Sequence, residues 1–398
     1  MSRAGVPALR VAMIGYAFMG ATHSQAWRTA AHVADLPLRP ELAVVVGRQS
    51  EAVAEAARRL GWAASETDWR RVVDRDDIDL VDICTPGNTH AEIAVAALAA
   101  GKHVLCEKPL ANSVAEAEAM VTAAEQAGVQ AMVGFTYRRT PAVALARQLV
   151  ADGTIGAVRQ VRAQYLQDWL ADEQVPLTWR LDKDRAGSGA LGDIGAHIVD
   201  AVEFVTGQRL TGVSGIIDTF VKERPVAAEG GPTAGAGLGG TAGDGFGPVT
   251  VDDAAVFFGK LESGALAAFE ATRYALGRKN AMRFEINGTQ GSLAFDFEQM
   301  NVLEHYDARR PADATGFTRI IVTEPSHPYL SYWWPPGHGL GYEHGFTHQV
   351  IDLVNAIGSG GIARPTFADG LHVQRVLAAV EASSAANSSW QSIPSDNN

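Results

Sequence analysis

The stretch LRVAMIGYAFMG, residues 9–20, decides how the N-terminal part of this chain folds. Residues 9–15 form a continuous apolar run ending in glycine, which is typical of a strand buried in a parallel sheet. Residues 15–20, GYAFMG, then open a helical stretch. Such a turn predicts dinucleotide binding, because main-chain N–H groups at a helix N-terminus can hold a pyrophosphate. Gly15 and Gly20 are in place, while Ala17 replaces the usual middle glycine.

The alternation of apolar runs and helical stretches continues downstream of this turn. Parallel neighbouring strands require a crossover connection, so the alternation predicts a doubly wound parallel sheet, the Rossmann architecture, over residues 1–140. The further strands are expected at 41–47, 78–86, 102–110 and 129–135, and further helices at 50–61, 90–101 and 113–128.

The remaining residues, 141–398, show strand alternation instead, at 157–169, 251–275 and 283–298. They predict a second, α+β domain with a large, open and mostly antiparallel sheet, for substrate binding and oligomerisation. A chain of 398 residues is long enough for two such cores. The glycine-rich insert at 225–249 has few large apolar groups, so we expect a long surface loop or a lid that orders on binding.

Composition excludes several function classes. The chain has 33 basic and 45 acidic residues, a net charge of -12, which argues against nucleic acid or an anionic membrane as partner. No apolar run approaches the ~18 residues of a membrane span, and we expect no signal peptide. Cys84 and Cys106 stand in no metal or disulfide pattern, which favours a reducing compartment. A cytoplasmic protein is the expectation.

The residues after the second strand bear on the choice of cofactor. An acidic side chain there would hold the ribose 2′-hydroxyl of NAD, but the strand ends in Gly47 followed by Arg48. A guanidinium could pair with a 2′-phosphate, so NAD(P) binding is predicted with NADP favoured over NAD. Alternatively, Arg48 stacks on adenine or points to solvent.

Two further motifs carry groups suited to acid–base chemistry. CEKPLA, residues 106–111, ends the fourth strand at the sheet edge where ligands bind, and it presents Lys108. GSGALGDIGAHIVD, residues 187–200, places Asp193 and His197 four residues apart, on one face of a helix. Taken alone, the second motif could instead be a capped helix with a buried histidine.

Taken together, these motifs resemble those of the Gfo/Idh/MocA oxidoreductases. The resemblance includes TPGNTH (85–90), FTYRRTPA (135–142) and ARPTFADGLH (363–372) and runs over essentially the whole chain. The short segments YLQDW (165–169), WR (179–180) and GSGALGDI more narrowly resemble the levoglucosan dehydrogenase-like members, which oxidise C3 of a sugar. The glycine-rich insert departs from the compact family core.

The resemblance implies roles for individual residues. The catalytic set would be Lys108, Asp193 and His197. The cofactor would contact Gly15, Phe18, Met19, Gly20, Arg48, Thr85, Pro86, Asn88, His90, Glu107 and Lys108. The substrate would contact Tyr137, Arg138, Gln167, Trp169, Trp179 and Arg180. A homodimer or homotetramer is expected by analogy with the family.

The function predicted is an NAD(P)-dependent oxidoreductase that moves a hydride between nicotinamide and a secondary alcohol of a sugar or polyol. Levoglucosan-like or other pyranoses are favoured, with C3 as the candidate carbon. His197 would be the base, Asp193 would orient the hydroxyl or the imidazole, and Lys108 would lower the pKa of the hydroxyl. A lysine base supported by histidine remains open.

Two other functions remain as alternatives: an NAD-dependent glycosidase of the same family and a non-catalytic, cofactor-sensing regulator. A metal site is not predicted. His344 and His348 have helical spacing, but no HExxH motif or completing carboxylate accompanies them.

Overall fold

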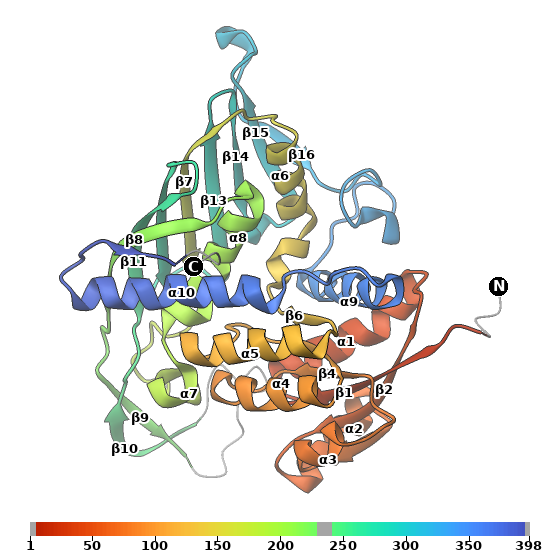
Figure 1. The fold of residues 1–398 in the computed structure, drawn as a ribbon. Helices are drawn as coiled ribbons and strands as arrows, with labels where there is room; N and C mark the ends of the chain where they lie inside the picture. The colour runs from red at the N-terminus through yellow and green to blue at the C-terminus, as the bar shows by residue number, and fades with distance from the viewer. Residues whose placement is uncertain (1–4, 229–240, 395–398) are drawn as a thin grey trace. The chain divides into compact units, whose positions relative to one another are not determined.

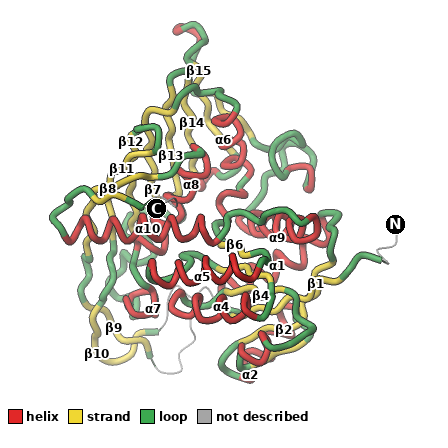
Figure 2. Tube along the Cα trace, viewed as in Figure 1, coloured by secondary structure: helices red, strands yellow, loops and turns green. Residues whose placement is uncertain are grey.

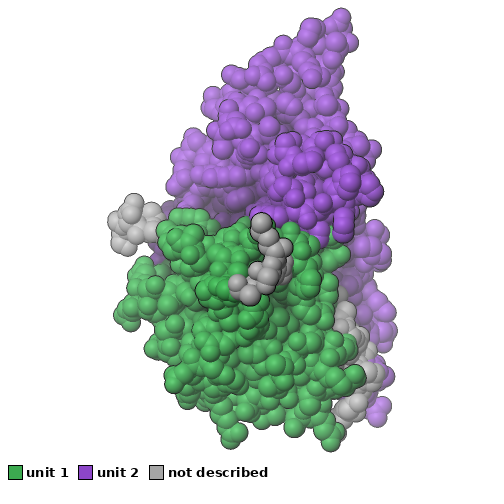
Figure 3. Space-filling model, turned by 90° about the vertical axis from the view of Figure 1, so that its right-hand side faces the viewer, with its two compact units in different colours: residues 1–136, 232–239, 342–372 green, residues 137–231, 240–341, 373–398 purple. Residues whose placement is uncertain are grey.

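A computed structural model of the chain describes residues 5–228 and 241–394. The described residues form two compact units, coloured separately in Figure 3. The first contains residues up to 136 together with 342–372, and the second contains the others. Residues 342–372 were predicted from the sequence to belong to the second domain. In the structure helix α9, Tyr342–Ser359, packs along α1, Phe18–Val33, which gives its buried residues an apolar partner.

The first unit is built on a six-stranded sheet in the order β3-β2-β1-β4-β5-β6, the Rossmann order (Figure 1). Every pair of neighbouring strands is parallel. The centre of the sheet is fully buried, as the apolar runs predict. The strands are β1 Ala8–Ile14, β2 Arg39–Val46, β3 Ala64–Glu66, β4 Leu80–Ile83, β5 His103–Cys106 and β6 Ala131–Val133.

Helices follow the strands as the alternation predicts. Besides α1 they are α2 Ser50–Leu60, α3 Trp69–Val73, α4 His90–Ala99 and α5 Val114–Ala127. Strand β3 and helix α3 were not predicted. They are short, and Ala64 to Glu66 carry no apolar run that would indicate a strand.

The second unit contains a nine-stranded sheet in the order β16-β15-β14-β13-β7-β12-β11-β8-β17. Figure 2 labels strands β7, β8 and β11 to β15 of this sheet. Only the pair β7 and β12 is parallel among the pairs described, so the predicted open, mostly antiparallel sheet is confirmed. Helices α6 and α8 pack on it. The strands are β7 Val158–Leu166, β8 Leu210–Asp218, β11 Ala254–Leu261, β12 Leu266–Thr272, β13 Ala281–Gly288, β14 Gly291–Asp296, β15 Val302–Asp307, β16 Thr318–Ile321 and β17 Gln391–Ser392. The helices are α6 Pro141–Ala151, α7 Lys183–Ala186 and α8 Ala196–Thr206, and α10, Phe367–Ala385, begins in the first unit and continues in the second from Val373.

The glycine-rich insert differs from the loop that the sequence analysis expected. Its described ends form a two-stranded antiparallel sheet, β9 Glu223–Ala227 and β10 Ala242–Pro248. The fully buried Arg224 anchors β9, because its guanidinium donates to the carbonyls of Leu170, Asp172 and Val175. Main-chain pairing and the buried guanidinium of Arg224 therefore order residues that have few large apolar groups, of which Val226 and Phe246 are exposed. Residues 229–240 of the insert lie outside the described part of the chain.

In the part of the chain that the structure describes, no helix combines the length and the apolar character that crossing a membrane requires.

Candidate functional site

The predicted pyrophosphate turn joins β1 to α1 in the first unit. Ala17 is the N-cap of α1 with φ −70°, so the backbone conformation at this position does not require glycine. The first turn of α1 carries no acidic residue. A Cβ on Gly20 would lie 2.1 Å from the carbonyl oxygen of Gly15, so the turn is tight. Phe18 stacks on Tyr342, with ring centroids 6.1 Å apart. The turn can thus present main-chain N–H groups to an anion.

Gly47 stands at the end of the second strand, where an acidic side chain would bind the ribose of NAD. The structure explains why this residue is a glycine. A Cβ at this position would lie 2.0 Å from Cε1 of Tyr16, so the aromatic ring lies against the bare glycine backbone. Gly47 is therefore required by Tyr16, whatever the cofactor. Arg48 beside it is exposed.

The loops after β4 and β5 lie at the same sheet edge as this turn, because Ile83 pairs in register with Cys106. Thr85 and Pro86 are half-buried, and Asn88 is exposed. His90, predicted to line the pocket, is buried instead. Its ring nitrogens lie 3.0 Å from the carbonyl oxygen of Pro109 and 2.8 Å from that of Thr85.

His90 therefore braces the two loops, and burial lowers its pKa. Lys108 is half-buried in the loop after β5, and its peptide bond to Pro109 is cis.

Beneath these loops lies a buried polar network that the sequence analysis missed. His23, on α1, lies between the carboxylates of Asp82 on β4 and Glu107 after β5, with a separation of 3.0 Å on each side. Trp27 donates its indole N–H to Asp82 over 2.7 Å. In sequence, His23 is an isolated histidine within a helix, with no sign of its carboxylate partners.

Cys84 donates its thiol to Asp82 over 3.6 Å, and with His23 and Asp82 it places three possible metal-ligand atoms close together. Burial raises the pKa of the Cys84 thiol, which opposes the thiolate form that a metal would bind. The nitrogen of His23 that faces Asp82 already makes a hydrogen bond. These residues are better described as a hydrogen-bonded network than as a metal centre.

In the second unit, the glycine-rich start of the motif at 187–200 packs against Asp252. A Cβ on Gly189 would lie 1.7 Å from the main-chain oxygen of Asp252, so only glycine fits. The Asp252 carboxylate accepts the main-chain N–H groups of Gly189 and Leu191, over 2.6 and 2.7 Å. Asp193 lies in a π-helical turn, Leu191–Gly195, and His197 follows in α8. The two residues therefore flank a junction of two helix types, not one regular helix as expected.

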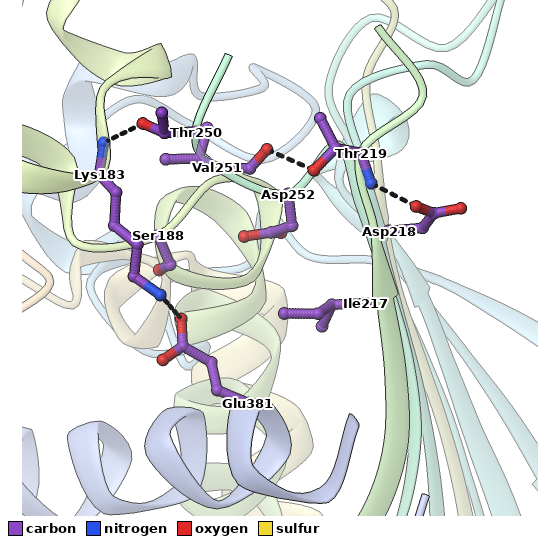
Figure 4. A pocket seen from close by; sticks show the side chains of 9 residues that line it. All are labelled: Lys183, Ser188, Ile217, Asp218, Thr219, Thr250, Val251, Asp252 and Glu381. Atoms are coloured by element: carbon purple, nitrogen blue, oxygen red, sulfur yellow. Dashed lines mark hydrogen bonds and ion pairs between the residues drawn. The ribbon is translucent and has the colours of Figure 1, made fainter. Parts of the chain in front are cut away.

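Ser188 of this glycine-rich stretch and Asp252 line a small cavity of about 170 Å³. Figure 4 shows the side chains that line it. Asp252 faces it, and Lys183 pairs with Glu381 across it at 3.6 Å. None of the predicted site residues lines this cavity.

Two cations accompany Asp193. Arg273 is fully buried, and its Nη1 lies 3.6 Å from the Asp193 carboxylate while its Nη2 donates to the main-chain oxygen of Asp252 over 3.0 Å. Arg180 is the second cation, and its guanidinium lies over the ring of Trp179 at 4.5 Å. Burial lowers the pKa of Arg180, and the charge of Asp193 partly offsets this effect. Two guanidinium groups beside a carboxylate favour its charged form.

His197 lies against two tyrosine rings. Its ring centroid is 4.7 Å from that of Tyr137 and 5.9 Å from that of Tyr165. The hydroxyl oxygens of these tyrosines lie 2.5 Å apart, and Tyr165 donates to Oδ1 of Asn280 over 2.6 Å.

The same Asn280 oxygen accepts from Gln167 over 2.9 Å, and Gln167 in turn accepts from Trp169 over 3.1 Å. We call Tyr137, Tyr165, Gln167, Trp169 and Asn280 the polar array. Tyr165 and Asn280 were not among the predicted site residues: Tyr165 lies in the quoted segment YLQDW but was given no role, and Asn280 lies in no quoted motif.

Arg138, a predicted substrate contact, makes a structural ion pair. Its guanidinium donates to both oxygens of Asp200 on α8, over 2.5–3.0 Å, and it lies over the ring of Phe204. Arg138 therefore holds the helix that carries His197, and its charge is compensated by a buried carboxylate.

Comparison with known proteins places these features in a family. Residues 9–135 match the family described as "Oxidoreductase family, NAD-binding Rossmann fold", and residues 143–294 match "GFO/IDH/MocA C-terminal domain". Levoglucosan dehydrogenase of Pseudarthrobacter phenanthrenivorans is 42% identical over 97% of this chain and 98% of its own length.

Solved structures agree. An oxidoreductase domain protein from Kribbella flavida is 64% identical, with a TM-score of 0.92 over 98% of this chain and 100% of its own. A levoglucosan dehydrogenase in complex with NADH and levoglucosan is 41% identical, with a TM-score of 0.90 over 97% of this chain and 100% of its own.

A Rossmann sheet joined to a sheet domain with these motifs defines an NAD-binding oxidoreductase. The chain belongs to the Gfo/Idh/MocA family of such enzymes, which confirms the resemblance seen in its motifs.

Proposed function

We propose that the chain is an NAD-dependent sugar dehydrogenase that oxidises a ring hydroxyl of a levoglucosan-like pyranose, with C3 as the candidate carbon. The observation that carries the proposal is the polar array beside His197. Its hydroxyl and amide groups can exchange hydrogen bonds with sugar hydroxyls, and its rings can cover apolar sugar C–H faces. The relative solved with NADH and levoglucosan supports this substrate class.

In the proposed mechanism, the protein supplies the proton chemistry. His197 accepts the proton of the reacting hydroxyl, since an imidazole has a suitable pKa of about 6.5. Asp193, held beside Arg273, orients the hydroxyl or the imidazole. The ammonium of Lys108 stabilises the developing alkoxide. Nicotinamide, when bound, accepts the hydride. A Lys108 base with His197 in support is the second assignment.

The residues of the first unit fit NAD. The turn Gly15–Ala17 and the N-terminus of α1 would hold the pyrophosphate, helped by Phe18, Met19 and Gly20, and the loop residues Thr85, Pro86, Asn88 and Glu107 would lie toward the nicotinamide end.

The preference predicted for NADP is replaced here by NAD. Tyr16 accounts for the glycine at position 47, so its lack of a carboxylate no longer points to a 2′-phosphate, and the levoglucosan dehydrogenase structures contain NADH. Exposed Arg48 is the residue through which NADP could still bind.

A panel of sugars followed by NADH absorbance, with NAD and NADP in parallel, tests the proposal. We expect reduction of NAD with levoglucosan or another pyranose. Cleavage of a glycoside without net reduction would indicate the glycosidase alternative, and binding of NAD without any turnover would indicate the regulator.

We also propose that two copies of the chain pair through the second-unit sheet. Ile216 on β8 and Val256 and Phe258 on β11 are exposed by 61, 49 and 61%, and Val256 pairs in register with Ile216. Apolar side chains gathered on one sheet face favour burial against another surface.

A further inference from the structure

The ring of His23 connects three elements of the first unit. It projects from α1 one turn after Gly20, and its nitrogens reach Asp82 on β4 and Glu107 after β5. The side chains of His23, Asp82 and Glu107 are exposed by only 1, 0 and 6%. Water therefore cannot replace these contacts.

The geometry fixes the number of protons in this group. A neutral imidazole has one N–H, yet both nitrogens lie 3.0 Å from carboxylate oxygens. Either the imidazole is charged and donates to both carboxylates, or Glu107 carries a proton that it donates to the ring. Both arrangements hold two shared protons and a net charge of −1.

Glu107 connects the network to the main chain of Lys108. Its second oxygen accepts the main-chain N–H of Lys108 over 3.2 Å. On its other side Gly134 closes the space, because a Cβ there would lie 2.8 Å from Oε1 of Glu107. The carboxylate is therefore confined by His23, Gly134 and the backbone that carries Lys108.

We propose that His23 is a positioning residue. Through its contact with Glu107 it fixes the position of Lys108 relative to helix α1, whose N-terminus would hold the cofactor. The inference rests on the proposed function for the role of Lys108. Removing the imidazole would leave two buried carboxylates without their shared donor, while Trp27 would still serve Asp82. Glu107 would then move, and the loop with Lys108 would move with it.

The protonation of the network supports this role. Burial alone would lower the pKa of His23, but the charges of Asp82 and Cys84 and the hydrogen bonds to both side chains together outweigh burial and raise it well above 6.5. The network therefore keeps both protons at neutral pH.

A double-mutant cycle tests the proposal. We expect His23→Gln to lower kcat by 10- to 100-fold and to change KM for the sugar by less than threefold. In the Glu107→Gln background the same change should alter kcat by less than twofold, because its route of action is already lost. The control is His32→Gln, at the exposed end of the same helix. A loss in kcat of equal size in both backgrounds would overturn the inference.

A second measurement needs neither a substrate nor a variant. The ¹⁵N resonances of the His23 ring in the unaltered protein, with NADH bound, should stay constant from pH 5.5 to 8.5. A ring that titrates near its ordinary value would contradict the inference even if the enzyme turns over sugars. Constant resonances in a protein that oxidises no sugar would instead retain the network and refute the proposed function.

Discussion

The hydroxyl oxygens of Tyr137 and Tyr165 lie 2.5 Å apart, and both rings contact the imidazole of His197. This contact joins the proposed base to the polar array, so groups that would recognise a sugar and the group that would take its proton share one cluster in the second unit.

Tyr137→Phe tests the recognition role of the array. The ring contacts with His197 and Phe297 remain, and only the hydroxyl is lost. Because one hydrogen bond contributes about 0.5–1.5 kcal/mol, we expect KM for the sugar to rise by roughly 3- to 10-fold, with a smaller effect on kcat. Steady-state kinetics would measure this. Tyr306→Phe, on β15, is the control, and an equal effect there would argue against a specific role.

His197→Ala should lower kcat by roughly 10²–10⁴ while the protein stays folded. The pH dependence of kcat identifies the base. A base must be deprotonated to act, so kcat falls on the acidic limb of the profile, and this limb should disappear in His197→Ala if His197 is the base. Should Lys108→Met remove that limb instead, the roles of the two residues would be exchanged.

Arg273→Met tests the support of Asp193. The substitution removes one of the two cations beside Asp193, the buried Arg273, and leaves Arg180. We expect kcat to fall by about tenfold or more, and the free energy of unfolding to fall by about 2–3 kcal/mol, since Asp193 is partly exposed and can recover some hydration. Urea unfolding and kinetics together separate the two effects. Unchanged kcat in a destabilised protein would make Arg273 purely structural.

The pH dependence of stability should report His23. Its pKa is raised in the folded protein, so its contribution is complete below about pH 6.5 and is lost as the pH rises through the folded pKa. The difference in unfolding free energy between the unaltered protein and His23→Phe should therefore shrink with rising pH, at up to about 1.4 kcal/mol per pH unit. Urea unfolding at pH 6 to 9, without NAD and at one protein concentration, measures it. A difference that grows with pH would refute the assignment.

Val256→Glu combined with Phe258→Glu tests the sheet face. Two carboxylates on a buried interface would repel and lose hydration, so we expect the assembly to dissociate toward monomers in light scattering. Leu276→Glu is the control, as Leu276 is exposed by 83% in a loop. Dissociation by the control, or none by the double variant, would exclude this interface.

The Rossmann sheet could be predicted from the sequence because its strands are apolar on both faces and its helices separate them regularly. Strand β3 could not, since Ala64 to Glu66 pair through main-chain hydrogen bonds alone. Residues 342–372 were assigned to the second domain for a similar reason: sequence order carries no record of which helix α9 packs against.

Motif residues were found by type and spacing, but their partners were not. Asp193 was recognised from its spacing of four residues to His197. Arg273, which pairs with Asp193, and Asp252, which accepts the main-chain N–H of Leu191 two residues before it, lie about 60 to 80 positions later in the chain. Asn280 looks like a turn residue in sequence. Its contact with Tyr165 depends on the pairing of β13 with β7, which no local pattern encodes.

The ring of Tyr16 against Gly47 links two positions that an engineer would treat separately. Installing an aspartate at 47 to sharpen discrimination between nicotinamide cofactors would collide with the phenol. A side chain at position 47 requires the Tyr16 ring to move, so a redesign of the cofactor preference should vary both positions together.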